Sequence, residues 1–332
     1  MTVGRPVAVN GSTRRVLVVG GAGYIGSVLT GQLLEEGYRV RVFDRFLFGD
    51  EALAAVCRHP GLEVCRGDVR DLQRVLEALD GVEAVVLLAS LVGERACDRD
   101  PQETIGVNYL ATVALAEACA YAGIARFLFA STDSAYGIQE GIMTEESPLQ
   151  PLSLYARLKA EAERKILALA NERFAPCVLR MATIYGLSPR MRFDLVVNVL
   201  TLHAATTRKC TVYGGAQWRP LVHVADAARA YGAALAAPLE AVRGQVFNVG
   251  SNEQNYQLFQ LGELVRQAIP DVVVETTDVP PDLRDYHVNF DKINRVFGYR
   301  ARHSVRDGVR EVYEAITEGR IPDPHHARYR NA

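Results

Sequence analysis

The stretch Val16-Leu17-Val18-Val19-Gly20-Gly21-Ala22-Gly23-Tyr24-Ile25-Gly26 decides the fold of this chain. It joins a run of apolar residues to an amphipathic segment through glycines in the spacing Gly-x-x-Gly-x-x-Gly. Gly20 permits a tight turn, Gly23 lets the backbone approach a pyrophosphate, and Gly26 allows the following helix to pack closely. A glycine triplet alone is a weak signal, but its position between a predicted strand and a predicted helix indicates a dinucleotide-binding turn.

The residues on either side of this turn alternate between short apolar runs and amphipathic stretches, which is the pattern of βαβ units around a parallel sheet. Six sheet strands are expected by residue 180. The predicted fold class is α/β, a Rossmann-like doubly wound parallel sheet with a smaller C-terminal substrate-binding region. We expect strands at 16–19, 39–43, 62–66, 84–89 and 126–130, and helices at 24–36, 72–79 and 104–122.

The alternation loosens between residues 187 and 220 and again after residue 252, where Pro, Arg and Tyr become more frequent. We therefore expect residues 14–182 and 221–250 to form the dinucleotide-binding domain. Residues 183–220 and 251–320 are expected to form the smaller region, which covers the carboxyl edge of the sheet. Residues 1–13 and 321–332 are expected to be mobile tails.

Composition and charge narrow the class of partner. The 332 residues are 49% hydrophobic and 23% charged, with a formal net charge of −2, so nothing suggests a nucleic-acid or membrane-surface binder. No apolar run approaches the roughly 18 residues of a spanning helix, and no signal peptide is evident, so we expect a cytoplasmic protein. The six cysteines and seven histidines are scattered without ligand spacing, and no metal site is expected.

Acidic residues at the ends of the second and third strands indicate how a dinucleotide would be selected. Asp44 lies about twenty residues beyond the glycine turn, where a carboxylate accepts hydrogen bonds from the adenosine ribose and repels a 2′-phosphate. This favours NAD over NADP, although Arg45 could soften the discrimination if it is more than a solvated loop charge. Asp68 either meets the adenine or caps a helix.

Tyr155 and Lys159 are the candidate chemical pair, because side chains at i and i+4 lie on one helix face. A free phenol titrates near 10, so a phenolate base at neutral pH needs a shift of about three units from nearby positive charge. The segment Ser131-Thr132-Asp133-Ser134-Ala135-Tyr136-Gly137 precedes the pair after the fifth strand. It would place the Thr132 hydroxyl at the carboxyl edge of the sheet.

Together these motifs resemble the extended short-chain dehydrogenase/reductases, the nucleotide-sugar epimerase and dehydratase family, from about Val16 to about Ile316. The resemblance implies that Thr132 hydrogen-bonds the reacting sugar oxygen, that Tyr155 moves the hydroxyl proton, and that Lys159 holds the nicotinamide ribose and lowers the tyrosine pKa. Asn108 matches a position that supports the site. The implied cofactor is NAD, and the residues expected to bind it are Gly20, Gly23, Tyr24, Ile25, Gly26, Asp44, Asp68, Val69, Leu88, Ala89, Tyr155 and Lys159.

The second half extends the resemblance and implies a nucleoside-diphosphate sugar as substrate. Residues 218–226 are similar to the family's Arg-x-[Phe/Leu]-Val-His-Val-x-Asp segment, so Arg219 is expected to bind the diphosphate. Arg284 would be a second arginine there, because two guanidinium forks suit a diphosphate; the alternative for both is a surface ion pair. Asn198 and Tyr213 match positions near the nucleotide. Thr183 stands where the family usually has Asn, which removes one expected diphosphate contact.

The resemblance implies an epimerase that oxidises a sugar carbon and returns the hydride to its other face. The alternatives are a reductase or dehydrogenase with net redox, and a non-catalytic dinucleotide sensor. Dehydration at carbons 4 and 6 is disfavoured, because Ser134 replaces the glutamate of the 4,6-dehydratases and would instead bind substrate. Asp133 is expected to act on the sugar or to cap the turn, and Glu94 could supply a carboxylate from another loop. A homodimer through helices at 104–122 and 154–170 is also implied.

Overall fold

Seven parallel strands form the central sheet of the computed structural model, which describes residues 14–277 and 284–331. The strand order is β11-β7-β5-β4-β1-β2-β3. The predicted tail at residues 1–13 lies outside the described residues. The strands are β1 (Arg15–Val19), β2 (Arg39–Asp44), β3 (Leu62–Arg66), β4 (Ala84–Leu87), β5 (Arg126–Thr132), β7 (Ala175–Met181) and β11 (Gln245–Val249).

The order of the strands makes this a doubly wound sheet. The chain moves outward from β1 through β2 to β3, then returns to pair β4 with the other side of β1 and moves outward again. Ligands bind at such a reversal, outside the carboxyl ends of the strands. The predicted α/β fold with a Rossmann-like sheet is confirmed.

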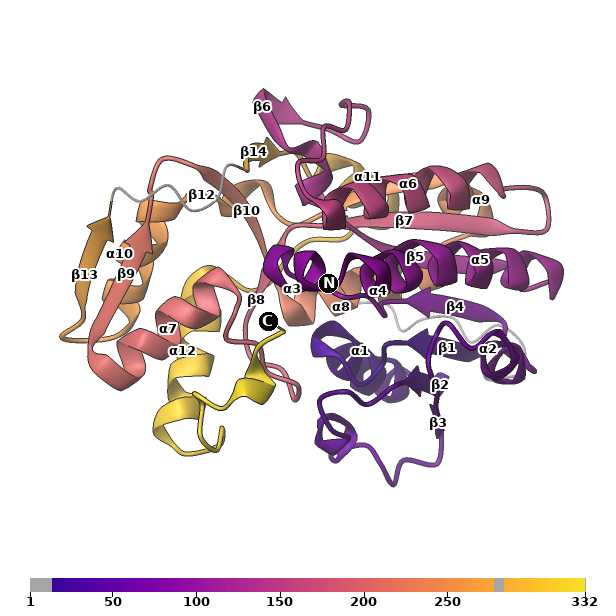
Figure 1. Ribbon diagram of the computed structural model, residues 1–332, viewed down its shortest axis with the longest axis horizontal. Coiled ribbons are helices and arrows are strands. Elements are labelled where there is room, and N and C mark those ends of the chain that lie inside the picture. Colours follow the sequence, from indigo (N-terminus) through magenta and orange to yellow (C-terminus); the bar gives the residue numbers. More distant parts are fainter. Residues whose placement is uncertain (1–13, 278–283, 332) are drawn as a thin grey trace, which may run out of the picture.

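Helices cover both faces of the sheet, which explains why β1 reads as a continuous apolar run. Val16 and Val18 pack on one side, and Leu17 and Val19 pack on the other. Figure 1 shows α1 and α8 on the opposite side of the sheet from α5 and α6. One side is covered by α1 (Tyr24–Glu35), α8 (Val224–Ala236), α9 (Leu239–Val242) and α11 (Asp291–Phe297), and the other by α2 (Leu72–Leu79), α5 (Thr112–Tyr121) and α6 (Leu154–Ala168).

The helix predicted at 104–122 is interrupted. The structure has α4 (Pro101–Ile105), then a turn of π-helix at Gly106–Ala111, then α5. Such turns hold one extra residue and often occur at functional sites. The apolar spacing of the sequence does not reveal this insertion, because the residues on either side keep their helical pattern.

A smaller region with its own apolar core lies beside the sheet, at the left of Figure 1. It contains α7 (Val196–Thr207), α10 (Leu258–Ala268) and α12 (Val305–Thr317), with β9 (Lys209–Tyr213) paired to β13 (Val273–Thr277). Because α8 packs on α1 and β11 joins the sheet, the structure supports the proposed assignment of residues 221–250 to the NAD-binding domain. The remaining elements are β6 (Ile138–Met143), β8 (Thr183–Tyr185), β10 (Trp218–His223), β12 (Asn255–Gln257), β14 (Asp285–Val288) and α3 (Glu94–Arg99).

The chain beyond residue 320, where the sequence predicts a tail, packs against the protein. Ile321 and Tyr329 are buried, and residues 327–329 form a turn of 3-10 helix. The Tyr329 ring meets the Phe193 ring edge-on at a centroid distance of 5.8 Å. These apolar anchors are isolated in a polar stretch, so the composition of the segment does not predict its packing.

Two further sequence expectations concern cysteines and membrane spans. The six cysteines are free thiols, four of them buried. Within residues 14–277 and 284–331, no helix has the length and apolar character to cross a membrane.

A buried ion pair attaches α6 to the sheet. The Arg180 guanidinium on β7 donates to both Glu163 oxygens, with Nη2 at 2.8 Å from Oε2, and both side chains are buried. Ser131 donates to the same carboxylate from the end of β5. Tyr136 accepts from Arg180 and donates to Asn248 at 2.7 Å. Strands β5, β7 and β11 and helix α6 therefore meet in one hydrogen-bonded group.

We predict that Glu163→Ala lowers the free energy of unfolding by about 3 to 5 kcal/mol, because it leaves the Arg180 charge buried without its carboxylate. Denaturant unfolding followed by circular dichroism measures this change. Glu161→Ala is the matched control, since Glu161 pairs with Arg164 on the exposed face of the same helix and should change stability by less than about 1 kcal/mol. Equal losses in the two variants would contradict the prediction.

Candidate functional site

The turn after β1 brings three backbone segments into close contact. Gly20 has a φ of +88°, and a Cβ at this position would lie 2.5 Å from the Ala89 nitrogen. A Cβ at Gly26 would lie 2.1 Å from the Gly20 carbonyl oxygen. The first turn of α1 has neither a side-chain cap nor an acidic residue. Its backbone N–H groups and the positive end of the helix dipole thus suit an anionic ligand.

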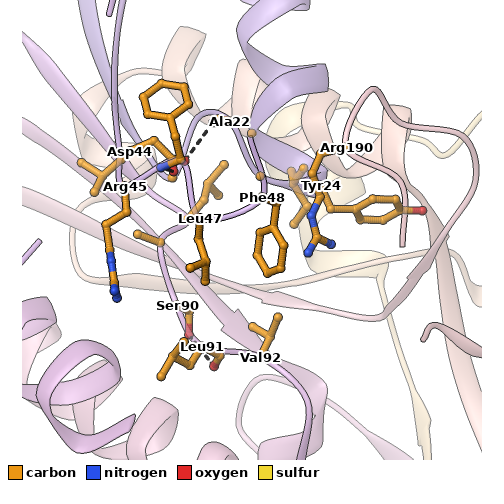
Figure 2. A pocket seen from close by; sticks show the side chains of 18 of the residues that line it. Ala22, Tyr24, Asp44, Arg45, Leu47, Phe48, Ser90, Leu91, Val92 and Arg190 are labelled. Carbon is orange, nitrogen blue, oxygen red and sulfur yellow. Dashed lines mark hydrogen bonds between the residues drawn. The ribbon is translucent and has the colours of Figure 1, made fainter. Parts of the chain in front are cut away.

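Asp44 is fixed at the end of β2 by two backbone donors. The Ala22 N–H donates to Oδ2 at 3.0 Å and the Phe46 N–H donates to Oδ1 at 2.7 Å. Burial raises the pKa of the Asp44 carboxyl, and the backbone hydrogen bonds oppose this shift. Asp44, Leu47 and Phe48 line one cavity together with the glycine turn, as Figure 2 shows. The cavity therefore joins an anion-binding turn to a half-buried carboxylate.

Asp68 does not cap α2, and its carboxylate contacts two arginines. Its carboxylate accepts hydrogen bonds from Arg70, at 2.6 Å from Nη2, and it lies 3.3 Å from the Arg45 Nε. The Arg70 hydrogen bond lowers the pKa of Asp68. The cap of α2 is Asp71. Asp68 itself does not line the cavity, whereas the adjacent residues Gly67 and Val69 do.

Asn108 fixes the loop that follows β4. The π-helical turn directs its amide inward, where Nδ2 donates to the Leu91 carbonyl at 2.8 Å. Oδ1 accepts from the Leu91 N–H at 2.8 Å and from the Ser90 hydroxyl at 2.9 Å. Leu88, Ala89, Ser90 and Leu91 line the first cavity. The predicted supporting role of Asn108 thus has a geometric basis, in that it shapes this wall.

A second cavity adjoins the first and brings the predicted chemical residues together. Thr132, Tyr155 and Lys159 all line it. It shares part of its wall with the first cavity; the shared residues are Ile25, Leu88, Ser90, Val92, Ile184 and Arg192. A ligand in the first cavity can therefore present one end to the Tyr155 hydroxyl.

Burial has the largest effect on the pKa values of Tyr155 and Lys159. It raises the pKa of Tyr155, with further increases from Cys97 and Glu94, and the Arg192 charge opposes the shift. Burial also lowers the pKa of Lys159 to about 8. The Lys159 ammonium donates to the Ala130 carbonyl at 2.9 Å. Arg192, which lies outside the quoted motifs, is thus a positive charge that opposes the rise in the Tyr155 pKa in this arrangement.

Ser134 and Arg284 meet in the second cavity. Arg284 Nη1 donates to the Ser134 hydroxyl at 2.8 Å and lies 3.3 Å from the Glu94 Oε1. The Ser134 N–H donates to Thr132 Oγ1 at 3.1 Å. Arg284 is therefore close to Thr132. Glu94, which the sequence analysis named as a carboxylate that another loop could supply, lines this cavity, but its pairing with Arg284 was not predicted.

The remaining predicted substrate residues separate into two groups. Arg219 and Tyr213 line the second cavity. Arg219 donates to the carbonyl oxygens of Trp218, at 2.8 Å, and of Arg284. Asn198 lies instead in the interior and lines neither of the two cavities. It donates to the Tyr24 hydroxyl at 3.0 Å and accepts from the Gly186 N–H, so the structure places it as a support for α1.

Asp133 also points away from both cavities. The 3-10 turn at Asp133–Tyr136 exposes Thr132 and Ser134 to the second cavity and buries Asp133 between them. Neither carboxylate oxygen has a hydrogen-bond partner within the described chain. Burial raises the pKa of Asp133 well above its ordinary value, although the Arg180 charge opposes this. This geometry does not support the expected contact between Asp133 and a sugar.

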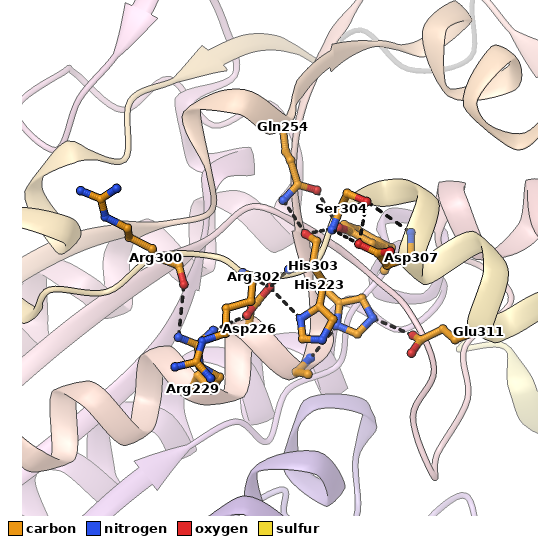
Figure 3. Close-up of polar contacts among 12 residues, drawn as sticks. His223, Asp226, Arg229, Gln254, Arg300, Arg302, His303, Ser304, Asp307 and Glu311 are labelled. Atoms are coloured by element: carbon orange, nitrogen blue, oxygen red, sulfur yellow. Dashed lines mark hydrogen bonds and ion pairs between the residues drawn. The ribbon is translucent and has the colours of Figure 1, made fainter. Parts of the chain in front are cut away.

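The motif at residues 218–226 divides between the site and the framework. His223 accepts from the Ala225 N–H at Nδ1, and its Nε2 lies 2.6 Å from the Glu311 Oε1. Figure 3 shows this pair next to Asp226, which accepts from the backbone of residues 302 and 303. His223 and Asp226 therefore attach the smaller region to the sheet, and Arg219 faces the cavity.

A model of the NAD dependent epimerase/dehydratase family matches residues 16–250. The chain belongs to this family. The match includes the glycine turn, Thr132, Tyr155, Lys159 and Arg219. It confirms the resemblance to the extended short-chain dehydrogenase/reductases, and the chain is thus an NAD-dependent enzyme of the isomerase or oxidoreductase class.

Relatives within the family differ in the reactions that their names describe. A UDP-glucose 4-epimerase of Corynebacterium glutamicum is 32% identical over 275 residues, which cover 76% of this chain and 80% of that protein. A dTDP-glucose 4,6-dehydratase of Streptomyces niveus is 30% identical over 325 residues, 92% of this chain and 94% of that protein. The structure of MoeE5 in complex with UDP-glucuronic acid and NAD is 30% identical, with a TM-score of 0.78 over 92% of this chain and 99% of that one.

NAD is the cofactor of the family, and the first cavity fits it. A Cβ at Gly20 or Gly26 would fill the turn that must approach a pyrophosphate. Asp44 lines the cavity as a carboxylate held by two backbone donors. These residues would hold the dinucleotide, and their assignment is carried forward as a proposal.

We predict that NAD binds at least about tenfold more tightly than NADP, a difference of roughly 1.4 kcal/mol, because the half-buried Asp44 carboxylate repels a 2′-phosphate. Asp44→Asn should narrow this ratio towards one, as measured by calorimetric titration of cofactor-free protein. Asp68→Asn is the control, since Arg70 already occupies that carboxylate. Tighter binding of NADP to the wild type, or an unchanged ratio in Asp44→Asn, would contradict the prediction.

Proposed function

We propose that this chain is an NAD-dependent epimerase of a nucleoside-diphosphate sugar. The proposal rests on one observation: Tyr155, Thr132 and Lys159 line a cavity that shares its wall with the cavity assigned to NAD. A sugar hydroxyl beside Tyr155 would then lie at the nicotinamide end of the cofactor. The relatives support a nucleotide sugar as the substrate class.

The reaction needs a group that takes and returns one proton. In the proposed mechanism Thr132 hydrogen-bonds the reacting sugar oxygen, and Tyr155 removes the hydroxyl proton as that carbon is oxidised to a ketone. NAD, when bound, supplies the hydride acceptor and donor for this carbon. The keto sugar then rotates in the site, so that the hydride returns to its other face while Tyr155 returns the proton to the oxygen. The product therefore has the opposite configuration at that carbon and the same mass. Lys159 would hold the nicotinamide ribose.

The two cavity arginines suit different parts of the substrate. Arg219 remains the proposed ligand of the diphosphate, since a guanidinium fork matches phosphate oxygens. Arg284 contacts Ser134, which in turn contacts Thr132. We therefore assign Arg284, together with Ser134, to the sugar rather than to the diphosphate.

The positions of Asp133 and Ser134 support a reaction without loss of water. Elimination beside a ketone needs an acid for the leaving hydroxyl and a base for the neighbouring carbon. Asp133 is buried away from the cavity, and Ser134 is a hydroxyl bound to Arg284. Among the described residues, Glu94 and Asp194 are carboxylates that line the second cavity, and they are paired with Arg284 and Arg192 respectively.

We predict epimerisation when the protein is incubated with NAD and a panel of UDP-, dTDP-, GDP- and CDP-hexoses. Mass spectrometry coupled to chromatography should give a product of unchanged mass and altered retention. A product lighter by one water would contradict the epimerase proposal and identify Glu94 as the base to examine. Consumption of NADH with a keto sugar would indicate the reductase alternative.

Tyr155→Phe is the matched variant for this experiment, because it removes only the proton-transferring hydroxyl. We expect turnover to fall by about 100-fold or more, the scale of a lost acid–base group. Calorimetry should show that NAD and nucleotide sugar still bind. Turnover near that of the wild type would exclude Tyr155 from the mechanism.

We also propose a homodimer through the helices at 104–122 and 154–170. Two apolar side chains on the first of these segments support it, because Leu110 is 59% exposed and Tyr121 is 94% exposed in the single chain. Large exposed apolar side chains that cluster often mark an interface.

We predict that the wild type sediments as a dimer and that Tyr121→Glu shifts it towards monomer, since a charge would be buried at the interface. Sedimentation velocity at micromolar concentrations measures this. Ile142→Glu is the control, as Ile142 is also exposed but lies on β6. A monomeric wild type would exclude the interface.

A further inference from the structure

The segment 321–331 returns from α12 to the edge of the cofactor cavity. Phe193 N–H donates to the Tyr329 carbonyl at 2.8 Å, and the Tyr329 hydroxyl donates to the Pro322 carbonyl at 3.1 Å. With Ile321 and Tyr329 buried, the segment is held by its own contacts. Its path brings Asn331 into the wall of the cavity that is assigned to NAD.

Asn331 connects two loops of that wall. Its Oδ1 accepts a hydrogen bond from Arg190 Nη2, and its Nδ2 donates to the Val92 carbonyl at 3.4 Å. Val92 belongs to the loop after β4, and Arg190 belongs to the loop that precedes α7. The Asn331 amide therefore connects the loop after β4 to the loop before α7, and residues from both loops line the first cavity.

Arg190 has the features of a ligand for an anion. It is 6% exposed, and its guanidinium carbon lies 3.7 Å from the centroid of the Phe48 ring. Figure 2 shows Arg190 and Phe48 side by side at the cavity. The Arg190 Nε is buried and has no hydrogen-bond partner within the described chain. A buried N–H on a charged group is costly unless an acceptor satisfies it.

The burial of Arg190 also affects its proton affinity. Burial, together with the nearby Arg192 charge, lowers the pKa of Arg190 to about 10. The guanidinium remains charged at neutral pH, but it lacks a full counter-charge. An anion bound next to it would therefore gain a charge-assisted hydrogen bond in a poorly solvated place, where such bonds are strong.

The position of Arg190 selects which anion this is. Arg190 lines the first cavity and also a third cavity, which Phe48 and Tyr329 line as well, but it does not line the second. Arg192 lines the first and the second cavities. The first cavity contains the glycine turn and Asp44, so the anionic group expected there is the pyrophosphate of the dinucleotide. A phosphate of the sugar nucleotide would instead lie in the second cavity, with Arg219.

We propose that Arg190 binds the cofactor phosphates and that Asn331 positions it, so that segment 321–331 acts as a strap which slows the release of NAD. The proposal rests on the assignment of the first cavity to NAD and deepens the epimerase proposal. An enzyme that returns the hydride to its own product does not need to exchange cofactor in each turnover. A strap over the cofactor suits such a cycle and opposes net redox with a freely exchanging cofactor.

The experiment measures the rate at which bound NAD leaves the purified protein. Protein loaded with radiolabelled NAD is mixed with excess unlabelled NAD, and the retained label is counted after rapid gel filtration. Arg190→Gln should release label about tenfold faster, the scale of one lost charge-assisted contact. Asn331→Ala should release it about threefold faster, since Arg190 is present but less well oriented. Arg190→Lys should fall between Arg190→Gln and the wild type, because it keeps the charge without the fork.

Two control variants change exposed residues of segment 321–331 but leave the contact between Asn331 and Arg190 in place. Arg330→Gln removes an exposed charge next to Asn331, and His325→Ala changes an exposed residue of the same segment. Both should release NAD at the wild-type rate. Thermal unfolding of each cofactor-free variant checks that the fold is retained, and all these variants leave the buried anchors Ile321 and Tyr329 unchanged.

The double variant Arg190→Gln with Asn331→Ala tests whether Asn331 acts by positioning Arg190 or by holding segment 321–331 in place. If Asn331 acts through Arg190, adding Asn331→Ala to Arg190→Gln should not accelerate release further. Additive effects would overturn the positioning role, and release at the wild-type rate from both single variants would overturn the strap. Gly26→Ala should abolish NAD binding. If the wild type retains no NAD, or Gly26→Ala binds NAD normally, the assignment of the first cavity to NAD is wrong. The proposal that segment 321–331 slows NAD release is then wrong as well.

Discussion

The buried pair of Glu163 and Arg180 is the interaction on which the site depends most. Glu163 lies one helical turn beyond Lys159 on α6, so the ion pair that holds Glu163 against β7 also sets where the face of α6 with Tyr155 and Lys159 lies. The same carboxylate accepts from Ser131, the residue before Thr132. One anion in the interior thus fixes both the strand end that carries Thr132 and the helix that carries Tyr155. Because the pair is fully desolvated, a different alignment would leave a charge unpaired.

The loop after β4 links the two halves of the site. Asn108 holds it from one side through a π-helical turn, and its residues contribute to the walls of both cavities. Further along, Val92 accepts from Asn331 and Glu94 pairs with Arg284. Ligands in the two cavities would therefore contact the same short segment.

The sequence predicts the sheet and the glycine turn well, because both depend on local signals. An apolar run such as Val16 to Val19 is buried on both faces, and Gly26 tolerates no Cβ beside Gly20. The direction of Asp133 was not predictable in this way, since a 3-10 turn decides which of three consecutive polar side chains reaches the cavity. Contacts such as that of Arg190 with Asn331 join residues 141 positions apart, and no periodicity in a single sequence encodes them.

The burial of Lys159 has a thermodynamic consequence for the whole protein. Its pKa falls from an ordinary 10.5 to about 8, which corresponds to roughly 3 kcal/mol of unfavourable free energy for the charged form. Below pH 8 the folded and unfolded chains are both protonated there, and folding bears this penalty in full. Between about pH 8 and 10.5 the unfolded chain keeps the proton longer, so the penalty fades as pH rises. At neutral pH the fold is therefore less stable than its packing alone would make it, and this instability is intrinsic to keeping an ammonium group at the reaction centre.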